Sequence, residues 1–462
     1  MSINIKETAT NEYIKRVRDL IEGGGKSACV ITLGCQQNEA DSEKIRAMAQ
    51  DMGYALSDDP MTADFIVVNT CAVRHHAELK ALSVVGNFKV LKKNNPALIV
   101  AVCGCMAAEP HMAEKIKKSY HHVSFTLEPS LMHTLPELLY KALEQHRRTF
   151  IFGSDSRDIV EGIGSVRASA HKAWVSIMYG CNNFCSYCIV PYVRGRERSR
   201  NSADIISECE SLVAQGYKEI TLLGQNVNSY KSDITFAALL EKIAQIPGDF
   251  ILRFMTSHPK DVSDELIEVF GRYTGKIAPS FHLPLQAGSD RILKEMNRTY
   301  NLEKYLCTVN KIREAVPDVA LTSDIIVGFP GETDDDFRAT MDALKKIRFD
   351  MVFSFIYSPR EGTRAAKMEA QVPENVQKAR MGELLDVQCN ISREINDKCL
   401  GKTERVIVDS YEIKDGKRIY SARTAKNKLV HFESDEDLIG KFINVKIIRT
   451  GAFDLFAEIE RN

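Results

Sequence analysis

The sequence has no uninterrupted apolar run of about 18 residues, the length that a membrane-spanning helix needs. Its first residues, Met1–Thr8, lack the apolar stretch of a signal peptide. The chain also has no excess of positive charge, because its 61 Lys and Arg are balanced by 62 Asp and Glu. We therefore expect a cytoplasmic protein with no membrane partner, in which any nucleic-acid contact depends on a local basic patch.

Cysteine, by contrast, is plentiful, with 12 in 462 residues. Without an export signal, this many cysteines indicate metal or redox chemistry rather than disulfides. Hydrophobic residues make up 44% of the chain and charged residues 27%, as is usual for globular proteins. The length predicts about three domains.

Three cysteines, Cys181, Cys185 and Cys188, follow the strand-like run 173–178 with the spacing C-x3-C-x2-C. This spacing lets three thiolates converge on one inorganic group from a single tight loop. A structural zinc site needs four ligands, and the sequence offers no nearby fourth Cys or His beyond His171. A four-iron cubane with three protein ligands keeps one iron open for a reaction. A zinc knuckle or buried free thiols are the alternatives.

With Tyr187 before its third cysteine, this motif resembles the radical S-adenosylmethionine (SAM) superfamily. The resemblance implies that SAM binds the open iron and that an electron from the cluster cleaves it to a 5′-deoxyadenosyl radical. It also implies a partial (β/α)6 barrel. The sequence supplies six strand candidates alternating with helical patterns, at 173–179, 219–224, 251–256, 280–285, 320–327 and 351–357.

Polar or glycine residues follow these strand candidates, at the end of the barrel where active sites lie. The resemblance implies that SAM is bound by Tyr187, Gly224, Gln225, Ser257, Gln286, Ser323 and Asp324. Any one of these residues could instead belong to a structural turn. The sequence identifies no general acid or base, so the catalytic side chains are unknown.

The first 150 residues contain three strand candidates that each end on a cysteine, Cys35, Cys71 and Cys105. Continuous apolar strands separated by helical segments predict a parallel sheet covered on both faces. The carboxyl ends of such strands lie about 5 Å apart at the edge where ligands bind, so the three thiols can meet around one cluster. Alternatively, cysteine is simply common in buried strands, which suits Cys29 and Cys103.

These strand ends also resemble the N-terminal domain of the methylthiotransferase family, in Leu33–Asn38, Asn69–Arg74 and Gly104–Ala107. The resemblance implies that Cys35, Cys71 and Cys105 hold a second, auxiliary [4Fe–4S] cluster, again with an open iron.

Two basic stretches are candidate RNA contacts. Next to the cysteine loop, four arginines stand against one Glu, and Arg pairs bidentately with phosphate. Within 414–428, six basic residues stand against one Asp, in a region whose five short strands suggest a small closed barrel. This region resembles a TRAM domain, an RNA-binding module. Solvated surface charge and protection of exposed strand edges are the alternatives. The candidate contacts are Arg194, Arg196, Arg198, Arg200, Lys417, Arg418, Arg423, Lys426 and Lys428.

The expected architecture is therefore a parallel-sheet α/β domain, then a partial (β/α)6 barrel, and finally a small β-barrel. The predicted divisions are a leader (1–26), an N-terminal cluster domain (27–153), a linker (154–172), a radical SAM barrel (173–397) and a TRAM-like domain (398–462).

The parts together resemble methylthiotransferases, and 188–195 and 224–230 look like the branch that acts on N6-isopentenyladenosine in tRNA. The resemblance implies replacement of the adenine C2–H by C2–S–CH3 next to the anticodon, with two SAM per turnover and two [4Fe–4S] clusters. The implied partners are the tRNA anticodon stem-loop, an electron donor such as a flavodoxin or ferredoxin, and an iron–sulfur carrier. Competing hypotheses are a methylthiotransferase for threonylcarbamoyl-adenosine tRNA or for a ribosomal-protein aspartate, and a two-cluster electron carrier with an RNA-binding tail.

Overall fold

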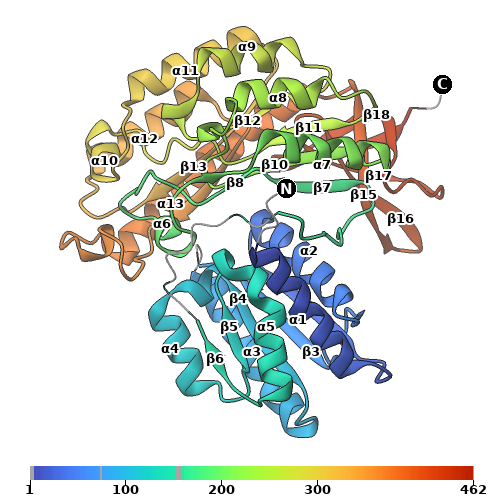
Figure 1. The fold of residues 1–462 in the computed structure, drawn as a ribbon. Coiled ribbons are helices and arrows are strands. Elements are labelled where there is room, and N and C mark those ends of the chain that lie inside the picture. The colour runs from blue at the N-terminus through green and yellow to red at the C-terminus, as the bar shows by residue number, and fades with distance from the viewer. Residues whose placement is uncertain (1–4, 73–74, 152, 154–158, 160, 461–462) are drawn as a thin grey trace. The chain divides into compact units, whose positions relative to one another are not determined.

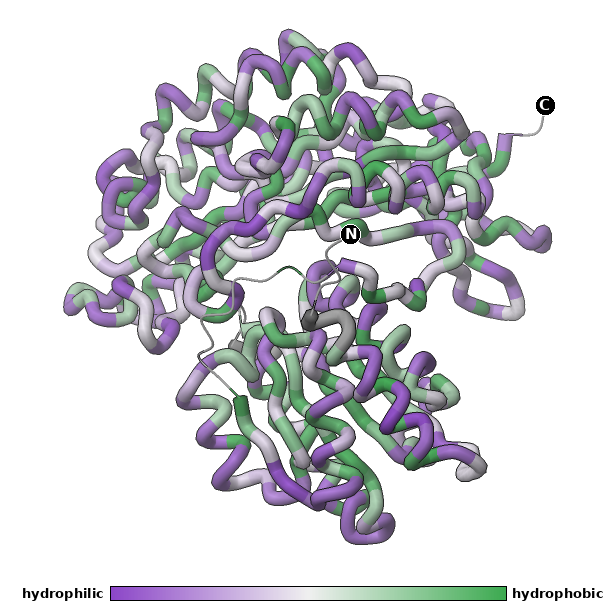
Figure 2. Tube along the Cα trace, in the orientation of Figure 1, coloured by the Kyte–Doolittle hydropathy of each residue, from purple (hydrophilic) through white to green (hydrophobic). Residues whose placement is uncertain are grey.

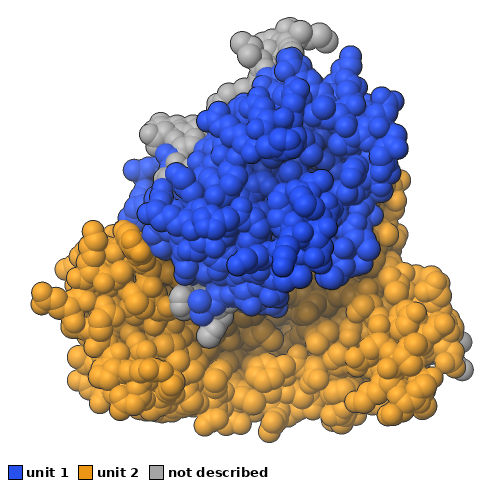
Figure 3. All heavy atoms as spheres, turned by 90° about the horizontal axis from the view of Figure 1, so that it is seen from below, with its two compact units in different colours: residues 1–168, 178–184, 188–198 blue, residues 169–177, 185–187, 199–462 orange. Residues whose placement is uncertain are grey.

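The computed structural model describes residues 5–72, 75–151, 153, 159 and 161–460 (Figure 1). The chain forms two compact units, coloured separately in Figure 3: residues 1–168, 178–184 and 188–198, and residues 169–177, 185–187 and 199–462. Of the predicted linker, residues 154–158 and 160 lie outside the described residues. Among the helices of the described ranges, none has both the length and the apolarity that crossing a membrane requires.

The first unit is built on a six-stranded parallel sheet with the order β2-β1-β3-β4-β5-β6. Its strands are β1 (Ser27–Leu33), β2 (Ala55–Leu56), β3 (Phe65–Thr70), β4 (Ile99–Gly104), β5 (Phe125–Leu127) and β6 (Thr149–Phe150). The predicted parallel sheet is confirmed, and its order places the three cysteine-bearing strands side by side.

Helices cover both faces of this sheet because its buried strands are apolar on both sides. Phe65 and Val67 of β3 pack in one hydrophobic core and Ile66 and Val68 in the other, as the alternation of a strand requires. The first core is closed by α1 (Ile5–Ile21), α2 (Gln36–Asp51) and α5 (Leu135–Glu144). The second is closed by α3 (His75–Asn94) and α4 (Pro110–Ser119).

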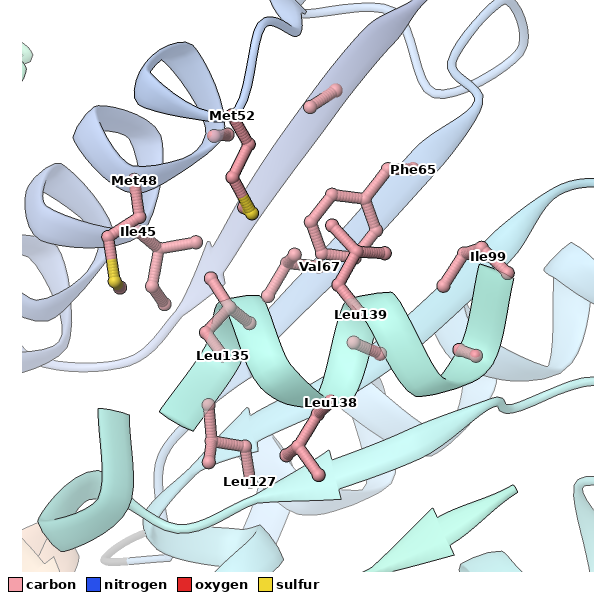
Figure 4. Close-up of a cluster of buried hydrophobic side chains, with 14 of the residues drawn as sticks. Ile45, Met48, Met52, Phe65, Val67, Ile99, Leu127, Leu135, Leu138 and Leu139 are labelled. Atoms are coloured by element: carbon pink, nitrogen blue, oxygen red, sulfur yellow. The ribbon is translucent and has the colours of Figure 1, made fainter. Parts of the chain in front are cut away.

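Figure 4 shows the first core, where side chains of α2 and α5 point toward Phe65, Val67 and Ile99 of the sheet. Val17 of α1 belongs to the same core and is fully buried. The helix within the predicted leader is therefore packed into the first unit. Hydrophobic residues gather along the strands of this sheet in Figure 2, while its helices alternate between hydrophilic and hydrophobic residues.

The second unit contains two three-stranded parallel sheets, β11-β10-β7 and β12-β13-β14. The strands are β7 (Lys172–Ser176), β10 (Glu219–Leu223), β11 (Ile251–Phe254), β12 (Ser280–His282), β13 (Ala320–Val327) and β14 (Met351–Ile356). A parallel bridge between Leu252 and Ile277 extends the first sheet. The six strand candidates of the sequence are therefore present as strands, and they form the two parallel sheets of the predicted barrel.

Helices alternate with these strands along the chain. They are α7 (Ser202–Ala214), α8 (Phe236–Ala244), α9 (Asp264–Arg272), α10 (Asp290–Glu295), α11 (Leu302–Ala315), α12 (Asp334–Ile347) and α13 (Glu374–Asp397). Several begin with a side chain that caps the free backbone N–H groups of the first turn; Thr333 and Asp336, for example, form a reciprocal capping box on α12.

The C-terminal part is a closed five-stranded barrel, as predicted, with the order β15-β16-β17-β19-β18. Its strands are β15 (Thr403–Lys414), β16 (Lys417–Thr424), β17 (Leu429–Glu433), β18 (Phe442–Thr450) and β19 (Asp454–Ile459). Tyr420 and Phe432 stack in its core with their ring planes 12° apart. Closure removes free strand edges, and buried apolar side chains from all five strands form the core of the barrel.

The small barrel contacts the amino ends of the strands of the larger, predicted barrel. The guanidinium of Arg253 in β11 donates to the carbonyl oxygens of Thr424 (2.9 Å) and Ala425 (2.7 Å), and it pairs with Glu219 (2.8 Å) at the start of β10. Lys428 pairs with Asp350, which directly precedes β14 (2.8 Å). The predicted SAM residues Gly224, Gln225, Ser257 and Gln286 follow the strands, at the opposite end from these contacts.

Candidate functional site

Cys35, Cys71 and Cys105 follow three adjacent strand ends in register. Leu33 of β1 is paired with Thr70 of β3, and Thr70 is paired with Gly104 of β4. Cys71 and Cys105 come directly after these residues and are buried, whereas Cys35 is solvent-accessible. The sheet therefore brings the three predicted ligands of the auxiliary cluster to one edge. Val73 and Arg74, which belong to the same motif, lie outside the described residues.

The thiols of this triad influence one another. A hydrogen bond with Cys71, more than any other contact, lowers the pKa of Cys35 to about 6. Burial raises the pKa of Cys105, and the positive charge of Arg194 opposes this. Thiolates are the form of cysteine that binds iron, so the arrangement fits the chemistry of a cluster held by three sulfurs.

Two buried amides lock the first turn of α2 to the end of β3. The Asn38 side chain donates to Asn69 Oδ1 (3.0 Å) and to the carbonyl of Thr70 (3.1 Å). Asn69 in turn donates to the Asn38 carbonyl (2.8 Å) and to Ser42 Oγ (2.9 Å). Buried polar groups that are fully bonded in this way fix one geometry. Sequence reasoning missed this role, although its signal is a helix whose buried face carries Asn38, Asp41 and Ser42.

Gly104 makes the turn between β4 and Cys105 possible. It has φ +93° and ψ −168°, a conformation that is essentially restricted to glycine. A Cβ atom here would lie 2.3 Å from the Thr70 carbonyl oxygen. The short helix η1 (Cys105–Ala108) begins immediately afterwards. The residue before the third cysteine is therefore glycine for two reasons, its backbone angles and the space available.

The second triad, Cys181, Cys185 and Cys188, lies on the loop after β8 (Met178–Tyr179). The two ends of this loop belong to the first unit. Gly180 has φ +77°, and a Cβ there would lie 2.1 Å from the carbonyl oxygen of Arg196. The Cys181 N–H donates to the Gly195 carbonyl (3.1 Å), and the Asn182 N–H donates to Glu197 (3.1 Å). The start of the cysteine loop is thereby held against residues 195–197.

The middle of the loop belongs to the second unit. Ser186 N–H donates to the Met296 carbonyl (3.0 Å) and its hydroxyl to the Glu295 carbonyl (2.7 Å). Tyr187 OH accepts a hydrogen bond from Arg298 (3.0 Å). The aromatic residue before the third cysteine is therefore fixed by the barrel.

Arg194 has partners that its prediction as an RNA contact did not anticipate. It is 4% exposed, its Nε–H donates to Cys105 Sγ (3.1 Å), and its Nη2 pairs with Asp41 (2.8 Å). Burial would lower its pKa, but Cys105 and Asp41 outweigh burial, and the pKa lies well above its ordinary value. The side chain is therefore charged and directed into the first unit, away from any phosphate in solvent.

Among the remaining arginines of this run, Arg196 is exposed, Arg198 is half-buried and Arg200 is buried. Arg200 donates to the Ser176 carbonyl (2.7 Å) and pairs with Glu208 (2.8 Å). The guanidinium of Arg196 stacks over the ring of Phe184 at 4.2 Å. Of the four, Arg196 thus has the geometry of a surface contact.

Apart from Tyr187 on the cysteine loop, the predicted SAM residues lie on or after the barrel strands. Gly224 and Gln225 follow β10, Ser257 lies after β11, and Gln286 follows β12 with φ +73°. The Gln286 N–H donates to the carbonyl of Asp324 in β13 (2.8 Å). Ser323 is fully buried, and its Oγ accepts from Leu285 N–H (2.8 Å), so its hydroxyl is engaged within the fold.

Two buried polar atoms at these strand ends fit a bound ligand. Ser257 Oγ and Asn226 Oδ1 have no hydrogen-bond partner within the part of the chain that the structure describes. A buried polar atom without a partner costs stability unless a ligand or water supplies one. Ser257 follows β11 and Asn226 follows β10, and these two strands are neighbours.

The described residues contain no group of three Cys, His, Asp or Glu side chains suited to a single metal ion. This result does not bear on a four-iron cluster, because each cysteine of such a cluster binds a different iron.

The predicted RNA contacts of the small barrel divide into two sets. Lys426 pairs with Asp318 and Lys428 with Asp350, at the docking contact with the radical SAM barrel, and both are mostly buried. Lys417, Arg418 and Arg423 all lie on β16 and have partners on the small barrel itself. Lys417 pairs with Glu433, Arg418 donates to the Asp435 carbonyl and Arg423 donates to the Asn427 carbonyl.

Comparisons with known proteins agree with this architecture. Residues 175–344 match the radical SAM superfamily, residues 27–128 match the uncharacterized protein family UPF0004, and residues 397–459 match the TRAM domain. A radical SAM protein requires a [4Fe–4S] cluster and SAM. Among solved structures, the radical S-adenosylmethionine methyltransferase TsrM from Kitasatospora setae shares the fold at 15% identity and TM-score 0.55, over 85% of this chain and 81% of that one.

Relatives along the whole chain are more specific. The tRNA-2-methylthio-N(6)-dimethylallyladenosine synthase of Acetivibrio thermocellus is 49% identical over 99% of this chain and 95% of its own length. The protein of the same name from Alkaliphilus oremlandii is 45% identical over 99% of both chains. The chain therefore belongs to the family of tRNA-2-methylthio-N(6)-dimethylallyladenosine synthases.

Proposed function

We propose that this chain is a radical SAM methylthiotransferase that converts N6-isopentenyladenosine next to the tRNA anticodon to its 2-methylthio derivative. The observation that carries the proposal is the identity of 49% with a synthase of that name over nearly the whole of both chains. Over such a span, all three parts that match known families are present together. In the reaction, the adenine C2–H is replaced by C2–S–CH3.

The proposed roles of the cysteines follow from their two settings. Cys181, Cys185 and Cys188 hold the cluster to which SAM binds, and Cys35, Cys71 and Cys105 hold a second [4Fe–4S] cluster. When bound, the first cluster and SAM supply the 5′-deoxyadenosyl radical that activates C2. The in-register strand ends, the thiolate tendency of Cys35 and the buried amides around Asn38 support the second set.

The protein's own residues then bind and orient. SAM is held by Tyr187, Gly224, Gln225, Ser257, Gln286, Ser323 and Asp324, among which the Ser257 hydroxyl provides an unused buried hydrogen-bonding group. Ser323 contributes from within the strand by positioning Leu285. Arg196 lies on an exposed surface beside Phe184 and Tyr192, where an aromatic and cationic surface suits an unstacked RNA base.

We further propose that the protein acts in the cytoplasm on tRNA and consumes two SAM per turnover. A flavodoxin- or ferredoxin-like protein donates its electrons, and an iron–sulfur carrier is a further partner. Residues 27–153 form the auxiliary-cluster domain, 173–397 the SAM barrel and 398–462 the RNA-binding domain. Half-buried Arg418, whose guanidinium lies over the ring of exposed Tyr411 at 5.3 Å, supports an RNA contact on the small barrel.

The test compares two cysteine variants on isopentenylated tRNA under reducing, anaerobic conditions. Cys181→Ala should abolish formation of 5′-deoxyadenosine, because the SAM cluster is lost. Cys71→Ala should still cleave SAM but form no methylthio-nucleoside, as measured by mass spectrometry of digested tRNA. Cys29→Ala is the matched control, because Cys29 is a buried strand cysteine outside both triads.

Normal product from Cys71→Ala would overturn the auxiliary-cluster assignment. Activity of the intact protein on threonylcarbamoyl-adenosine tRNA, with none on isopentenylated tRNA, would overturn the proposed substrate.

A further inference from the structure

Arg194, which follows the second cysteine set in the sequence, contacts Cys105 of the first set within the first unit. Arg194 follows Cys188 by six residues, at the end of α6 (Val190–Val193). Its Nε lies 3.1 Å from Cys105 Sγ, to which the Nε–H donates, and its Nη2 lies 2.8 Å from Asp41 Oδ2. One guanidinium therefore bridges a predicted iron ligand and a buried carboxylate on α2.

Packing fixes the backbone that carries Arg194 independently of this hydrogen bond. Ile189 and Val193 form a buried cluster with Ala72, Ala108 and Cys105. The Arg194 N–H donates to the Val190 carbonyl (2.9 Å). A substitution of the Arg194 head group that keeps its aliphatic stem should therefore leave α6 in place.

The position of Arg194 gives it two effects on a cluster bound to Cys105. Hydrogen bonds to the sulfur ligands, nearby charge and solvent exposure set the reduction potential of an iron–sulfur cluster. An N–H donor and a positive charge both stabilise the reduced cluster, which carries one more electron. Because Arg194 and Asp41 are 4% and 3% exposed, water and salt screen these effects poorly.

We propose that Arg194 is a positioning residue that raises the reduction potential of the auxiliary cluster through its N–H···S hydrogen bond to Cys105, with Asp41 holding the guanidinium in place. The inference rests on the proposed function, which supplies the cluster on Cys35, Cys71 and Cys105. Asp41 has the opposite electrostatic effect, because its negative charge disfavours reduction. The two partners of one ion pair should thus shift the potential in opposite directions.

The test measures the potential of the auxiliary cluster alone. The full-length chain with Cys181, Cys185 and Cys188 replaced by Ala is reconstituted, and its reduction is followed by electron paramagnetic resonance during a redox titration. In this background, Arg194→Met should lower the equilibrium constant for reduction of the cluster at least tenfold. This corresponds to a fall in the reduction potential of about 59 mV for a one-electron couple. Asp41→Asn keeps a hydrogen-bond acceptor but removes the negative charge, so it should shift the potential upward.

Two further variants separate this contact from general damage. Arg194→Lys keeps the charge, but its single nitrogen cannot bridge both partners, so its potential should fall between those of the parent and Arg194→Met. Arg196→Met removes an exposed arginine from the same run and should leave the potential unchanged.

An unshifted potential in Arg194→Met with the cluster loaded would overturn the proposal, and so would an equal shift in Arg196→Met. If Arg194→Met fails to hold iron, Asp41→Asn decides: an unchanged or lowered potential refutes the inference. A parent protein with no iron would instead refute the second cluster of the proposed function.

Discussion

Replacement of Gly104 by Ala should remove the proposed auxiliary cluster and leave the SAM cluster in place. Gly104 combines φ +93° with ψ −168°, and an alanine in this region costs about 1–3 kcal/mol. The new Cβ would also lie 2.3 Å from the Thr70 carbonyl oxygen, which is backbone of the central strand and cannot rotate away. Overpacking of this kind costs about 1–3 kcal/mol more.

Together these costs are about 2–6 kcal/mol, so the ligand geometry at Cys105 should be disfavoured by about thirtyfold or more. With the two proposed clusters the parent should hold about eight irons per chain, and reconstituted Gly104→Ala should hold about four. It should still form 5′-deoxyadenosine from SAM but no methylthiolated nucleoside. Iron analysis and nucleoside mass spectrometry on the same preparation measure both effects.

Gly25→Ala is the matched control for this experiment. Gly25 also has a positive φ, +56°, but a Cβ there would meet nothing within 4 Å. The control therefore carries backbone strain without the collision, and it should retain both clusters. If Gly104→Ala held about eight irons and made normal product, the assignment of Cys105 as a ligand fixed by this turn would be refuted.

Three other substitutions have defined outcomes. Gly180→Ala should cause the converse loss, with SAM cleavage abolished and the auxiliary cluster retained, because a Cβ there would lie 2.1 Å from a carbonyl oxygen; iron content and 5′-deoxyadenosine assays measure this. Arg253→Met should destabilise the second unit by about 3–5 kcal/mol, because Glu219 becomes a buried charge without its main partner; urea unfolding followed by Trp174 fluorescence measures it. Ser257→Ala should weaken SAM binding about two- to tenfold by removing a net 0.5–1.5 kcal/mol hydrogen bond, as measured by calorimetry.

Arg253→Met and Ser257→Ala each have a matched control. Arg405 pairs with Asp249 at the surface, where both side chains are about half exposed, so Arg405→Met should cost about 1 kcal/mol or less. Ser354 also carries a buried hydroxyl without a partner among the described residues, but it was not predicted to bind SAM. Equal losses in Arg253→Met and Arg405→Met, or in Ser257→Ala and Ser354→Ala, would contradict the two explanations.

The stability effect of Arg253 should depend on pH. Burial would raise the pKa of Glu219, but Arg253 and Lys172 outweigh burial, and the pKa lies below its ordinary value. A depressed carboxyl pKa contributes stability above the ordinary value and loses it as the pH falls through the depressed one. The difference between the parent and Arg253→Met should therefore be full at neutral pH and shrink in acid. A constant difference would show that the ion pair is not its source.

Much of the fold follows from local pattern in the sequence. Apolar runs at 28–33, 65–70 and 98–104 predict parallel strands, and the connection rules then place their ends together. The bridging role of Arg194 could not be predicted in this way. A run of four arginines looks the same whether a side chain faces solvent or a cysteine 89 residues earlier, because burial depends on tertiary contacts that local sequence does not encode. The same holds for Lys426 and Lys428, whose aspartate partners lie in distant loops.

The docking of the small barrel changes how a truncation experiment would have to be interpreted. A chain cut after α13 would leave Asp249, Asp318 and Asp350 without their present partners, which are basic residues of the removed segment. The three unpaired carboxylates would make this surface of the shortened enzyme more acidic, so that it would repel polyanions. Lost tRNA affinity in such a deletion would combine missing contacts with new repulsion, and only point substitutions on β16 would separate the two.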